Sequence, residues 1–426
     1  MNIFIKFVLV LATSLNLFAG DYTILNDKII KDNFSINPSF DFSDKLNTDV
    51  KASVLKPKVG DFSNIPNYAF SYLNNLVVNA TTDSLSTIDC VMYSINMKDI
   101  PDALIAARDR GVKVRVIIDN NHVYPSADTQ IKKLMQAGDG IEVRTLRGTR
   151  DYGVTHNKIT IHDKTLVTAG SYNWTFSATF SNYENMLVFR NPVYVKGYID
   201  YFEWMWSKAR TIDQGASPVL PEGYYGKPPQ SPSNLISLNG VNVPLYLFSP
   251  GSDTENKLAA LIDAAKTSVD AVTFTFSSQP IADAIIRAYK RGVKVRFLED
   301  IDMAKSSAMA KMVYESGVPF KWMGGRNEKG AMHNKFIILD GQVLGTGSFN
   351  FTTNASVNSF ENMVFTNDDS IIMAYSSKFG WFYSQATAPS SSADFDGVTD
   401  NGGTDNNGRT NKGFMGSDIP SDKEID

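Results

Sequence analysis

The chain holds four histidines, and two of them stand in nearly identical surroundings. Residues 155–174 read THNKITIHDKTLVTAGSYNW, and residues 332–351 read MHNKFIILDGQVLGTGSFNF. Each stretch gives His-Asn-Lys, an apolar run, and then Gly-Ser-aromatic-Asn. Positions i and i+2 of a strand point to the same face, so His156 shares a face with Lys158, and His333 with Lys335. Each stretch therefore offers an imidazole beside a fixed positive charge.

Polar residues near the end of the following strand complete each set. They follow a glycine and can reach back beside the histidines: Ser171, Asn173, Ser348 and Asn350. Lysine neutralises phosphate as a point charge, while hydroxyl and amide groups donate hydrogen bonds. Histidine serves as nucleophile, acid or base near neutral pH. Two sets on opposite sides of one phosphate would cleave a phosphodiester, and the pattern contains no metal cluster and requires no cofactor.

An aspartate follows each histidine by seven residues, Asp163 in the first stretch and Asp340 in the second. An odd offset points to the opposite face of a strand. Both residues also begin turns, Asp163-Lys164 and Asp340-Gly341. We therefore expect both aspartates to be structural residues rather than phosphate ligands.

The elements around these sets are repeated as well. DALIAARDRGVKVRVIIDNN (102–121) matches DAIIRAYKRGVKVRFLEDID (283–302), and SNYENMLVF (181–189) matches NSFENMVFT (358–366). Self-similarity of this length indicates duplication of a whole domain rather than a solenoid repeat. The predicted boundaries are 61–211 for the first domain, 212–242 for a linker rich in Pro, Gly and Ser, and 243–386 for the second domain.

Strand and helix patterns alternate within each copy. In the first copy, strands are expected near 87–95, 112–118, 141–146, 154–162, 165–170 and 184–189, and helices near 99–110, 127–137 and 193–209. This order predicts two duplicated α/β/α sandwich domains with mixed, largely parallel sheets. We expect a pseudo-two-fold relation between the domains, with the active site at their interface.

The two ends of the chain differ from its body. Residues 1–20 have one charge, an apolar run and small residues at the end, which is typical of a cleaved signal peptide and predicts a secreted or periplasmic protein; an uncleaved anchor is the alternative. Residues 21–60 are an unassigned lead-in. Residues 387–426 are polar and acidic and are expected to be disordered, with calcium binding disfavoured by the lack of a closing glutamate. A lone Cys90 in an apolar strand is expected to be buried.

The H-x-K-x4-D pattern followed by G-S-x-N, twice per chain, resembles the phospholipase D superfamily over nearly all of residues 60–386. The resemblance implies a two-step reaction through a covalent phosphohistidine, independent of metal. One histidine would be the nucleophile and the other the general acid and then base; family habit favours His156 as nucleophile. The resemblance also implies phosphate ligands (Lys158, Lys335, Asn173, Asn350) and acidic residues that hold the imidazoles (Glu184, Glu361).

The substrate class is less constrained by the sequence. The motif text is similar both to small secreted bacterial nucleases and to a mitochondrial cardiolipin hydrolase. Basic residues precede each motif and would suit a nucleic acid or an anionic lipid: Arg144, Arg147, Arg150, Arg326 and Lys329. Because the body of the chain is nearly neutral, phospholipid hydrolysis is favoured over endonuclease activity; phosphatidyl transfer and a non-catalytic secreted binding protein are further alternatives.

Phospholipid or nucleic acid is thus the expected partner, with peripheral contact to a membrane surface and no obligate protein partner. The remaining histidines, His122 and His162, do not recur in the second copy and are expected on the surface or in loops. Several aromatic residues are candidates for an apolar mouth, with core packing as the default for each: Tyr72, Tyr124, Tyr152, Trp174 and Trp322.

Overall fold

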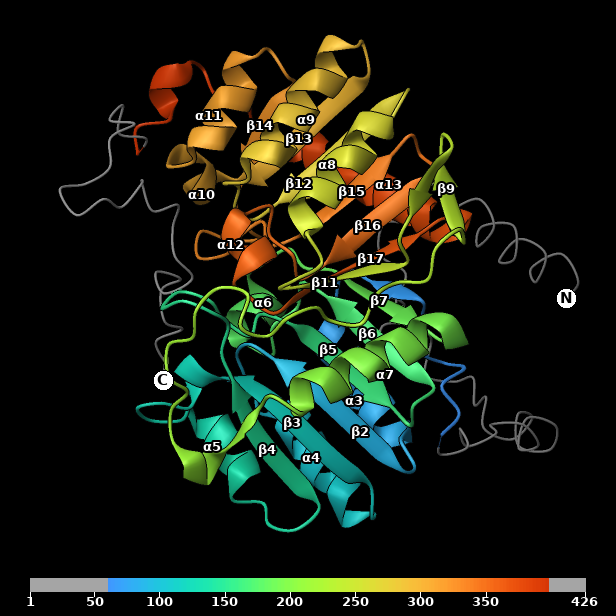
Figure 1. The fold of residues 1–426 in the computed structure, drawn as a ribbon, viewed down its shortest axis with the longest axis vertical. Helices are drawn as coiled ribbons and strands as arrows, with labels where there is room; N and C mark the ends of the chain where they lie inside the picture. The colour runs from blue at the N-terminus through green and yellow to red at the C-terminus, as the bar shows by residue number, and fades with distance from the viewer. Residues whose placement is uncertain (1–59, 398–426) are drawn as a thin grey trace, which may run out of the picture. The chain divides into compact units, whose positions relative to one another are not determined.

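The structure is a computed structural model that describes residues 60–397. The predictions for the signal peptide, for the lead-in up to residue 59 and for residues 398–426 fall outside the described residues. Within the described range the chain forms two similar α/β halves, each with its own central sheet (Figure 1).

The first half contains the elements from β1 to η2. Its helices are α3 (Leu73–Asp83), α4 (Asp99–Asp109), η1 (Asn120–His122), α5 (Thr129–Met135), α6 (Phe176–Phe180), α7 (Pro192–Trp206) and η2 (Ile212–Gln214). Its strands are β1 (Tyr68–Ala69), β2 (Thr87–Met92), β3 (Lys113–Asp119), β4 (Ile141–Leu146), β5 (Lys158–His162), β6 (Leu166–Gly170), β7 (Met186–Phe189) and β8 (Arg210–Thr211).

The second half repeats this order after a small hairpin of β9 (Ile236–Leu238) and β10 (Val241–Val243). Its strands are β11 (Tyr246–Ser249), β12 (Ser268–Thr273), β13 (Lys294–Asp300), β14 (Phe320–Met323), β15 (Phe336–Leu339), β16 (Val343–Gly347) and β17 (Glu361–Thr366). Its helices are α8 (Thr254–Ala264), α9 (Gln279–Lys290), α10 (Ile301–Lys305), α11 (Ala308–Glu315), α12 (Thr353–Val357), α13 (Asp369–Gln385) and η3 (Ser392–Asp394).

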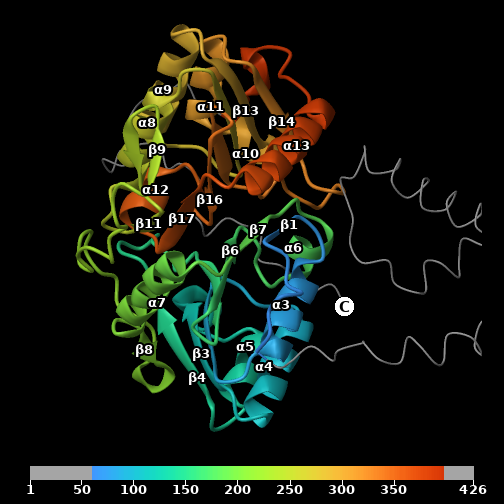
Figure 2. The same cartoon turned by 90° about the vertical axis from the view of Figure 1, so that its right-hand side faces the viewer.

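Both sheets are mixed, but the expectation that they are largely parallel is wrong. The strand orders are β1-β7-β6-β5-β2-β3-β4-β8 and β11-β17-β16-β15-β12-β13-β14. Among the named strands of residues 60–397, only β2–β3–β4 and β12–β13–β14 pair in parallel. The strand after each histidine pairs antiparallel with β2 or β12 and turns back through a short hairpin, β5–β6 or β15–β16. β7 and β17 then return through α6 or α12 and pair antiparallel with β6 and β16. Helices cover both faces of each sheet, so the sandwich architecture is confirmed (Figure 2).

The repeated Gly-Val-Lys-Val-Arg stretch has a structural explanation. Arg115 donates to Asp89 on the neighbouring strand at 2.7 Å, and Arg296 donates to Asp270 at the same distance. Each guanidinium also lies over an aromatic ring of the long helix that closes its half, Arg115 over Phe202 and Arg296 over Phe379. The arginine thus fastens α7 or α13 to its sheet through an ion pair and a cation–π contact.

Parts of the predicted linker and of the tail predicted to be disordered pack on the folded body. In the predicted linker, Tyr225 is buried, packs on Phe360 with ring centres 4.7 Å apart, and donates to the Arg147 carbonyl at 2.7 Å. In the predicted disordered tail, residues 387–397 belong to the folded body, because Phe395 is buried against Phe320. In each segment a single aromatic residue within a polar stretch packs on the folded body. The average composition of the segment does not reveal such a contact. Cys90 is buried, as predicted.

Glu299 on β13 is a buried carboxyl with no counterpart in the first half, where Ile118 occupies the matching place. Neither carboxyl oxygen has a well-formed hydrogen bond, and burial raises the pKa of Glu299 well above its usual value, with only a small offset from the nearby Phe276 amide. A raised carboxyl pKa destabilises the fold above the ordinary pKa of glutamate. We expect Glu299→Ile to increase the free energy of unfolding by about 1–3 kcal/mol.

Denaturant melts of Glu299→Ile and of the isosteric Glu299→Gln measure this effect. The gain of the isoleucine variant should be larger at pH 8 than at pH 4, since the wild-type penalty grows with pH. Equal or lower stability at both pH values would show that the carboxyl is satisfied in the fold.

Candidate active site

Each catalytic candidate histidine is placed by a buried aspartate that sequence inspection missed. Asp119 accepts a hydrogen bond from the Thr155 N–H at 2.6 Å, one residue before His156. Asp300 accepts from the Met332 N–H at 2.9 Å, one residue before His333. Asp119 and Asp300 are the last residues of β3 and β13, at the same place in the repeated sequence, so the repeat contained the signal. The aspartates fix the turn that delivers each histidine to the domain interface.

The segments ahead of the histidines pair across the two halves. Thr155 bridges to Phe360 of the second half, and the His156 N–H donates to the Phe360 carbonyl at 2.9 Å. Tyr183 of the first half bridges to Met332, and the His333 N–H donates to the Tyr183 carbonyl at 3.1 Å. Each histidine is therefore held next to the residue that precedes the other half's glutamate.

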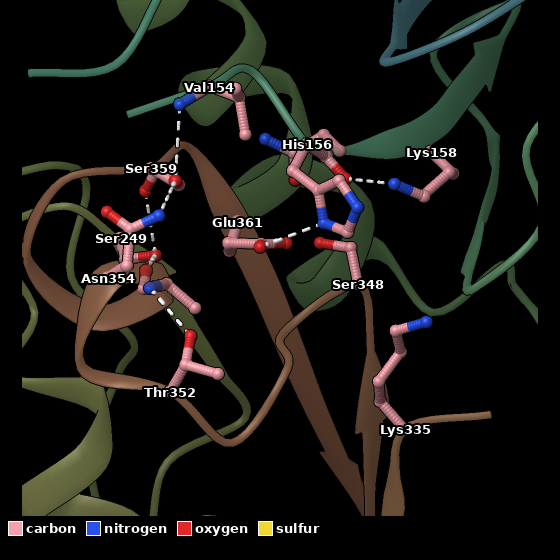
Figure 3. A network of polar contacts seen from close by, with 12 residues as sticks. Val154, His156, Lys158, Ser249, Lys335, Ser348, Thr352, Asn354, Ser359 and Glu361 are labelled. Carbon is pink, nitrogen blue, oxygen red and sulfur yellow. Dashed lines mark hydrogen bonds and ion pairs between the residues drawn. The ribbon is translucent and has the colours of Figure 1, made fainter. Parts of the chain in front are cut away.

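The glutamates consequently bind the histidines crosswise. His156 Nδ1 lies 2.9 Å from Glu361 Oε1, while His333 Nδ1 lies 2.8 Å from Glu184 Oε1 and 2.9 Å from Oε2. Figure 3 shows the Glu361 carboxylate directed at the ring of His156. A carboxylate at Nδ1 keeps the proton on that nitrogen and leaves Nε2 as the reactive atom. The sequence predicted that the glutamates hold the imidazoles, but not that each serves the other half.

The asparagines next to these residues make a second crosswise layer. Asn362 Nδ2 donates to Asn157 Oδ1, and Asn185 Nδ2 donates to Asn334 Oδ1, both at 2.8 Å. All four side chains are buried. The middle residue of each His-Asn-Lys and the residue after each glutamate thus join the halves. Both halves together make up one composite site.

The lysines lie beside the histidines at the centre of this site. Lys158 Nζ donates to the His156 carbonyl, and Lys335 Nζ to the His333 carbonyl, each at 2.6 Å. Figure 3 shows Lys158 and Lys335, from different halves, on the same side of the His156–Glu361 pair. Burial lowers the pKa of both lysines, that of Lys158 to about 7. A bound anion between the ammonium groups would favour their charged form.

The other ionisable groups are also shifted by burial. Burial, followed by the nearby lysines, lowers the pKa of His156 and of His333 well below the usual range. Burial raises the pKa of Glu184 to about 7 and of Glu361 to about 8. After burial and Lys158, the charges of Lys335 and His333 of the other half also lower the pKa of His156, because the two sets lie close together.

The predicted hydroxyl and amide ligands have different surroundings. Ser171 donates to Glu184 Oε2 at 2.5 Å, and the Ser348 hydroxyl accepts from the Asn362 N–H at 3.1 Å. These hydroxyls therefore lie against the glutamate and asparagine layer. By contrast, the side-chain oxygens of Asn173 and Asn350 are buried without a partner within residues 60–397. An amide oxygen accepts hydrogen bonds, so a phosphate contact of either residue would use its Nδ2 group as the donor.

Both motif aspartates bind backbone at the far end of their strands. Asp163 accepts from the Leu85, Ser86 and Thr87 N–H groups at 2.7–3.0 Å. Asp340 accepts in the same way from the Lys266, Thr267 and Ser268 N–H groups at 2.7–3.1 Å. Each carboxylate thus ties a hairpin turn to the start of the central strand. These contacts support the structural role that the sequence predicted.

We expect Asp340→Asn to lower the free energy of unfolding by about 1 kcal/mol, a value discounted because the group is partly exposed. Burial acts to raise the pKa of Asp340, but the three N–H donors outweigh it and lower this pKa to about 2. A depressed carboxyl pKa stabilises the fold above the ordinary value, so the loss appears at neutral pH and vanishes as the pH falls toward 2. Denaturant melts at several pH values measure the loss of stability, and turnover per folded molecule is measured in parallel. A variant that is inactive but as stable as wild type would contradict the structural role.

An aromatic ring packs on each histidine, and sequence inspection missed both rings. Tyr93 meets His156 edge-on with centres 5.0 Å apart, and Phe274 meets His333 at 4.8 Å. Both follow the second strand of their half at the same position, so comparing the copies would have revealed them. The rings restrict the histidine rotamers and lie near the lysine ammonium groups, at 5.2 and 5.1 Å.

Of the two remaining histidines, His162 differs from expectation. His162 is buried, not on the surface, and is hydrogen bonded to Ser84 and Thr160. His122 is partly exposed and pairs with Asp128 at 2.9 Å, yet its ring also meets Tyr93 at 4.7 Å. His162 therefore serves the core, while His122 lies one ring away from His156.

Two of the three basic residues ahead of the first motif, Arg144 and Arg147, are used within the fold, whereas Arg150 is exposed. Arg144 lies over Trp206, and Arg147 donates to the Arg150 and Asp151 carbonyls. Arg326 and Lys329 of the second loop are exposed. Of the candidate mouth aromatics, Trp174 and Trp322 are buried, whereas Tyr72 is 61% exposed.

Among the described residues no group of histidine, cysteine, aspartate and glutamate side chains has the arrangement of a metal site. No helix within residues 60–397 is both long and apolar enough to cross a bilayer.

The similarity of this chain to known proteins covers both halves and their His-x-Lys motifs. The family described as "Cardiolipin synthase, PLD-like domain" matches residues 77–206 and 258–383, more than half of the chain and one segment in each half. The chain belongs to this family. Membership in the PLD-like family accounts for the duplicated halves and for the paired His-x-Lys motifs that they bring together.

Individual relatives cover less of the chain. It is 33% identical over 136 residues to the human protein named mitochondrial cardiolipin hydrolase, and the match spans 53% of that protein. It is 30% identical over 141 residues to the phospholipase D of Rickettsia prowazekii, spanning 67% of it. The phosphatidylserine synthase of Haemophilus influenzae shares the PLD-like fold over 78% of this chain and 88% of its own, with a TM-score of 0.60 and 12% identity.

Proposed function

We propose that this protein is a phospholipase D-type hydrolase that cleaves head-group phosphodiesters of phospholipids through a phosphohistidine. The crosswise His–Glu pairs around two buried lysines carry the proposal, because they set two imidazoles and two ammonium groups around one anion-binding place. Related proteins named cardiolipin hydrolase and phospholipase D support a lipid substrate over a nucleic acid. The signal-like residues 1–20 support a secreted or periplasmic location.

In the proposed first step, Nε2 of His156 attacks phosphorus while the bond to the leaving alcohol breaks. His333, whose protonated form Glu184 stabilises at Nδ1, gives its proton to the leaving oxygen. Glu361 at Nδ1 stabilises the positive charge that forms on the phosphorylated ring of His156. In the second step His333 takes a proton from water, the new oxygen attacks phosphorus, and the bond from phosphorus to His156 breaks. The lysines stabilise the phosphoryl oxygens in both steps, assisted by Asn173 and Asn350.

Ser171 and Ser348 fit a positioning role in this scheme. The Ser171 hydroxyl donates its hydrogen bond to Glu184, so it orients the carboxylate that holds His333. The chemistry proceeds without a metal ion, because the ammonium groups supply the positive charge at the phosphate.

A substrate panel tests the function directly. Purified protein is incubated with phosphatidylcholine, cardiolipin, single- and double-stranded DNA and RNA, each with and without excess chelator. We expect release of a lipid head group or of phosphatidic acid, unchanged by chelator. Turnover of nucleic acid alone would replace the proposal with endonuclease activity. Loss of turnover in chelator, restored by zinc or magnesium, would contradict the metal-independent mechanism.

The pH profile of kcat/KM should fall on its alkaline side as Lys158 loses its proton. Burial lowers the pKa of Lys158 to about 7, so the charged form that binds phosphate declines as the pH rises through that value. The pH dependence of kcat/KM reports the pKa of the free protein, and that of kcat reports the pKa of the complex. The alkaline fall should therefore occur at higher pH in kcat, because bound phosphate stabilises the charged ammonium group. A kcat/KM that stays constant or rises through this range would show that an uncharged lysine suffices.

A further inference from the structure

Exposed aromatic rings gather on one face beside the candidate active site. Phe176 and Phe180 of α6 are 62% and 51% exposed, and their rings are 4.6 Å apart. The helix begins three residues after Asn173. At the matching positions of the second half, α12 carries Thr353 and Val357 instead. The duplicated fold therefore does not require these two phenylalanines.

A basic loop of the second half connects this helix to further exposed aromatics. The Arg326 N–H donates to the Ser181 carbonyl at 2.7 Å, directly after α6. The Arg326 guanidinium lies over Tyr183 and donates to the Phe70 carbonyl at 2.9 Å, two residues before Tyr72. Tyr183 in turn meets Trp381 of α13, which is 44% exposed. We call Tyr72, Phe176, Phe180, Arg326, Lys329 and Trp381 the aromatic rim.

The elements that carry the rim are connected to the site and lie away from the β9–β10 hairpin. Residues 325–333 carry both Arg326 and His333, and the Tyr183 carbonyl binds the His333 N–H at 3.1 Å. Figure 2 shows α6, β1 and α13 on one side of the molecule, with β9 and α8 on the other. A surface held against the rim would thus lie next to the strand that presents His333.

We propose that the aromatic rim docks the protein on a phospholipid bilayer that contains anionic lipid. Aromatic rings at an exposed edge lower their free energy by entering the interfacial region of a membrane. Within the rim loop, Arg326 and Lys329 outweigh the acidic Glu328, and Lys378 lies 4.9 Å from the Trp381 ring. This positive excess complements anionic head groups. The inference rests on the proposed function and adds how a lipid substrate in a bilayer is reached.

Nucleic acid is the competing occupant, since it also binds aromatic and basic side chains. The two phenylalanines favour the bilayer, because they have no polar group and form the most exposed ring pair of the rim. A bilayer buries such a pair without requiring a base on each ring.

Vesicle sedimentation of the full chain tests the proposal without relying on catalysis. Vesicles of phosphatidylcholine, with or without phosphatidylglycerol, are mixed with wild type, with Phe176→Thr/Phe180→Val, which installs the second-half residues, and with Lys329→Gln. A matched control replaces two exposed apolar residues of the hairpin face, Leu235→Thr/Val241→Thr. Wild type should bind better when phosphatidylglycerol is present. The phenylalanine pair variant should lose binding about tenfold or more, Lys329→Gln about threefold, and the control should match wild type.

A soluble diester, bis(p-nitrophenyl) phosphate, separates docking from chemistry. Rim variants should keep wild-type turnover of this diester and lose turnover of vesicle lipid. If wild type binds vesicles but cleaves no diester, the proposed function fails and the rim stands. Equal vesicle binding by wild type and the phenylalanine variant would overturn the rim. So would a variant defect confined to oligonucleotide binding or to self-association in gel filtration.

Discussion

His156→Ala and His333→Ala each lower kcat on a phosphodiester by about a thousandfold or more. The two histidines come from different halves but share one cluster with two lysines and two glutamates. Neither can replace the other, because nucleophile and acid must stand on opposite sides of phosphorus. Steady-state turnover of each variant on the best substrate of the panel measures the effect.

The double variant gives a second constraint. The effects of two residues that act on the same bond are not additive. The turnover of His156→Ala/His333→Ala should therefore lie within a small factor of that of the slower single variant. His162→Leu is the matched control, since it replaces a buried histidine with leucine, the residue type at the matching position 339 of the second half. Its turnover per folded molecule should remain near wild type. A single-histidine variant with half of the wild-type rate would indicate two independent sites.

Glu361→Gln and Glu184→Gln should each lower kcat by about 10- to 100-fold. Each glutamate holds Nδ1 of the other half's histidine at 2.8–2.9 Å, and an amide supplies neither the negative charge nor the same preference for the Nδ1 proton. Because the carboxylates position rather than react, the loss should be smaller than for the histidine variants.

The crosswise assignment has a readout besides activity. In proton–nitrogen NMR spectra of the histidine rings, Glu361→Gln should move the Nδ1–H resonance of His156 and leave that of His333 nearly unchanged. Glu184→Gln should do the reverse. Ser171→Ala should affect His333 more than His156, since Ser171 binds Glu184. Shifts confined to the histidine of the same half would refute the exchange of glutamates.

The sequence predicted the parts of the site that depend on local spacing. The period of two placed each lysine beside its histidine, and the odd offset separated Asp163 and Asp340 from them. The crosswise pairing was not predictable, because it depends on single bridges between halves, Thr155 to Phe360 and Tyr183 to Met332, that leave no periodic pattern. The buried aspartates and aromatic rings were visible in the repeat but resembled ordinary strand ends.

The fold was predicted to a similar depth. Strand and helix positions followed from apolar periodicity, and the duplication followed from repeated text. Strand direction was misjudged because alternation of strands and helices suggested crossovers, whereas β5 and β6 form a hairpin and β7 returns antiparallel to β6 after α6. Burial of His162 and Phe395 depends on tertiary neighbours far away in the chain, Ser84 and Phe320, so local composition gave no sign of it.

Calorimetric titration with inorganic phosphate tests the composite site most directly. One phosphate should bind per chain, and either Lys158→Ala or Lys335→Ala alone should weaken binding by about tenfold or more, because one anion contacts both ammonium groups. Two phosphates per chain, each lost in only one lysine variant, would mean that the halves bind separately and that no shared site exists.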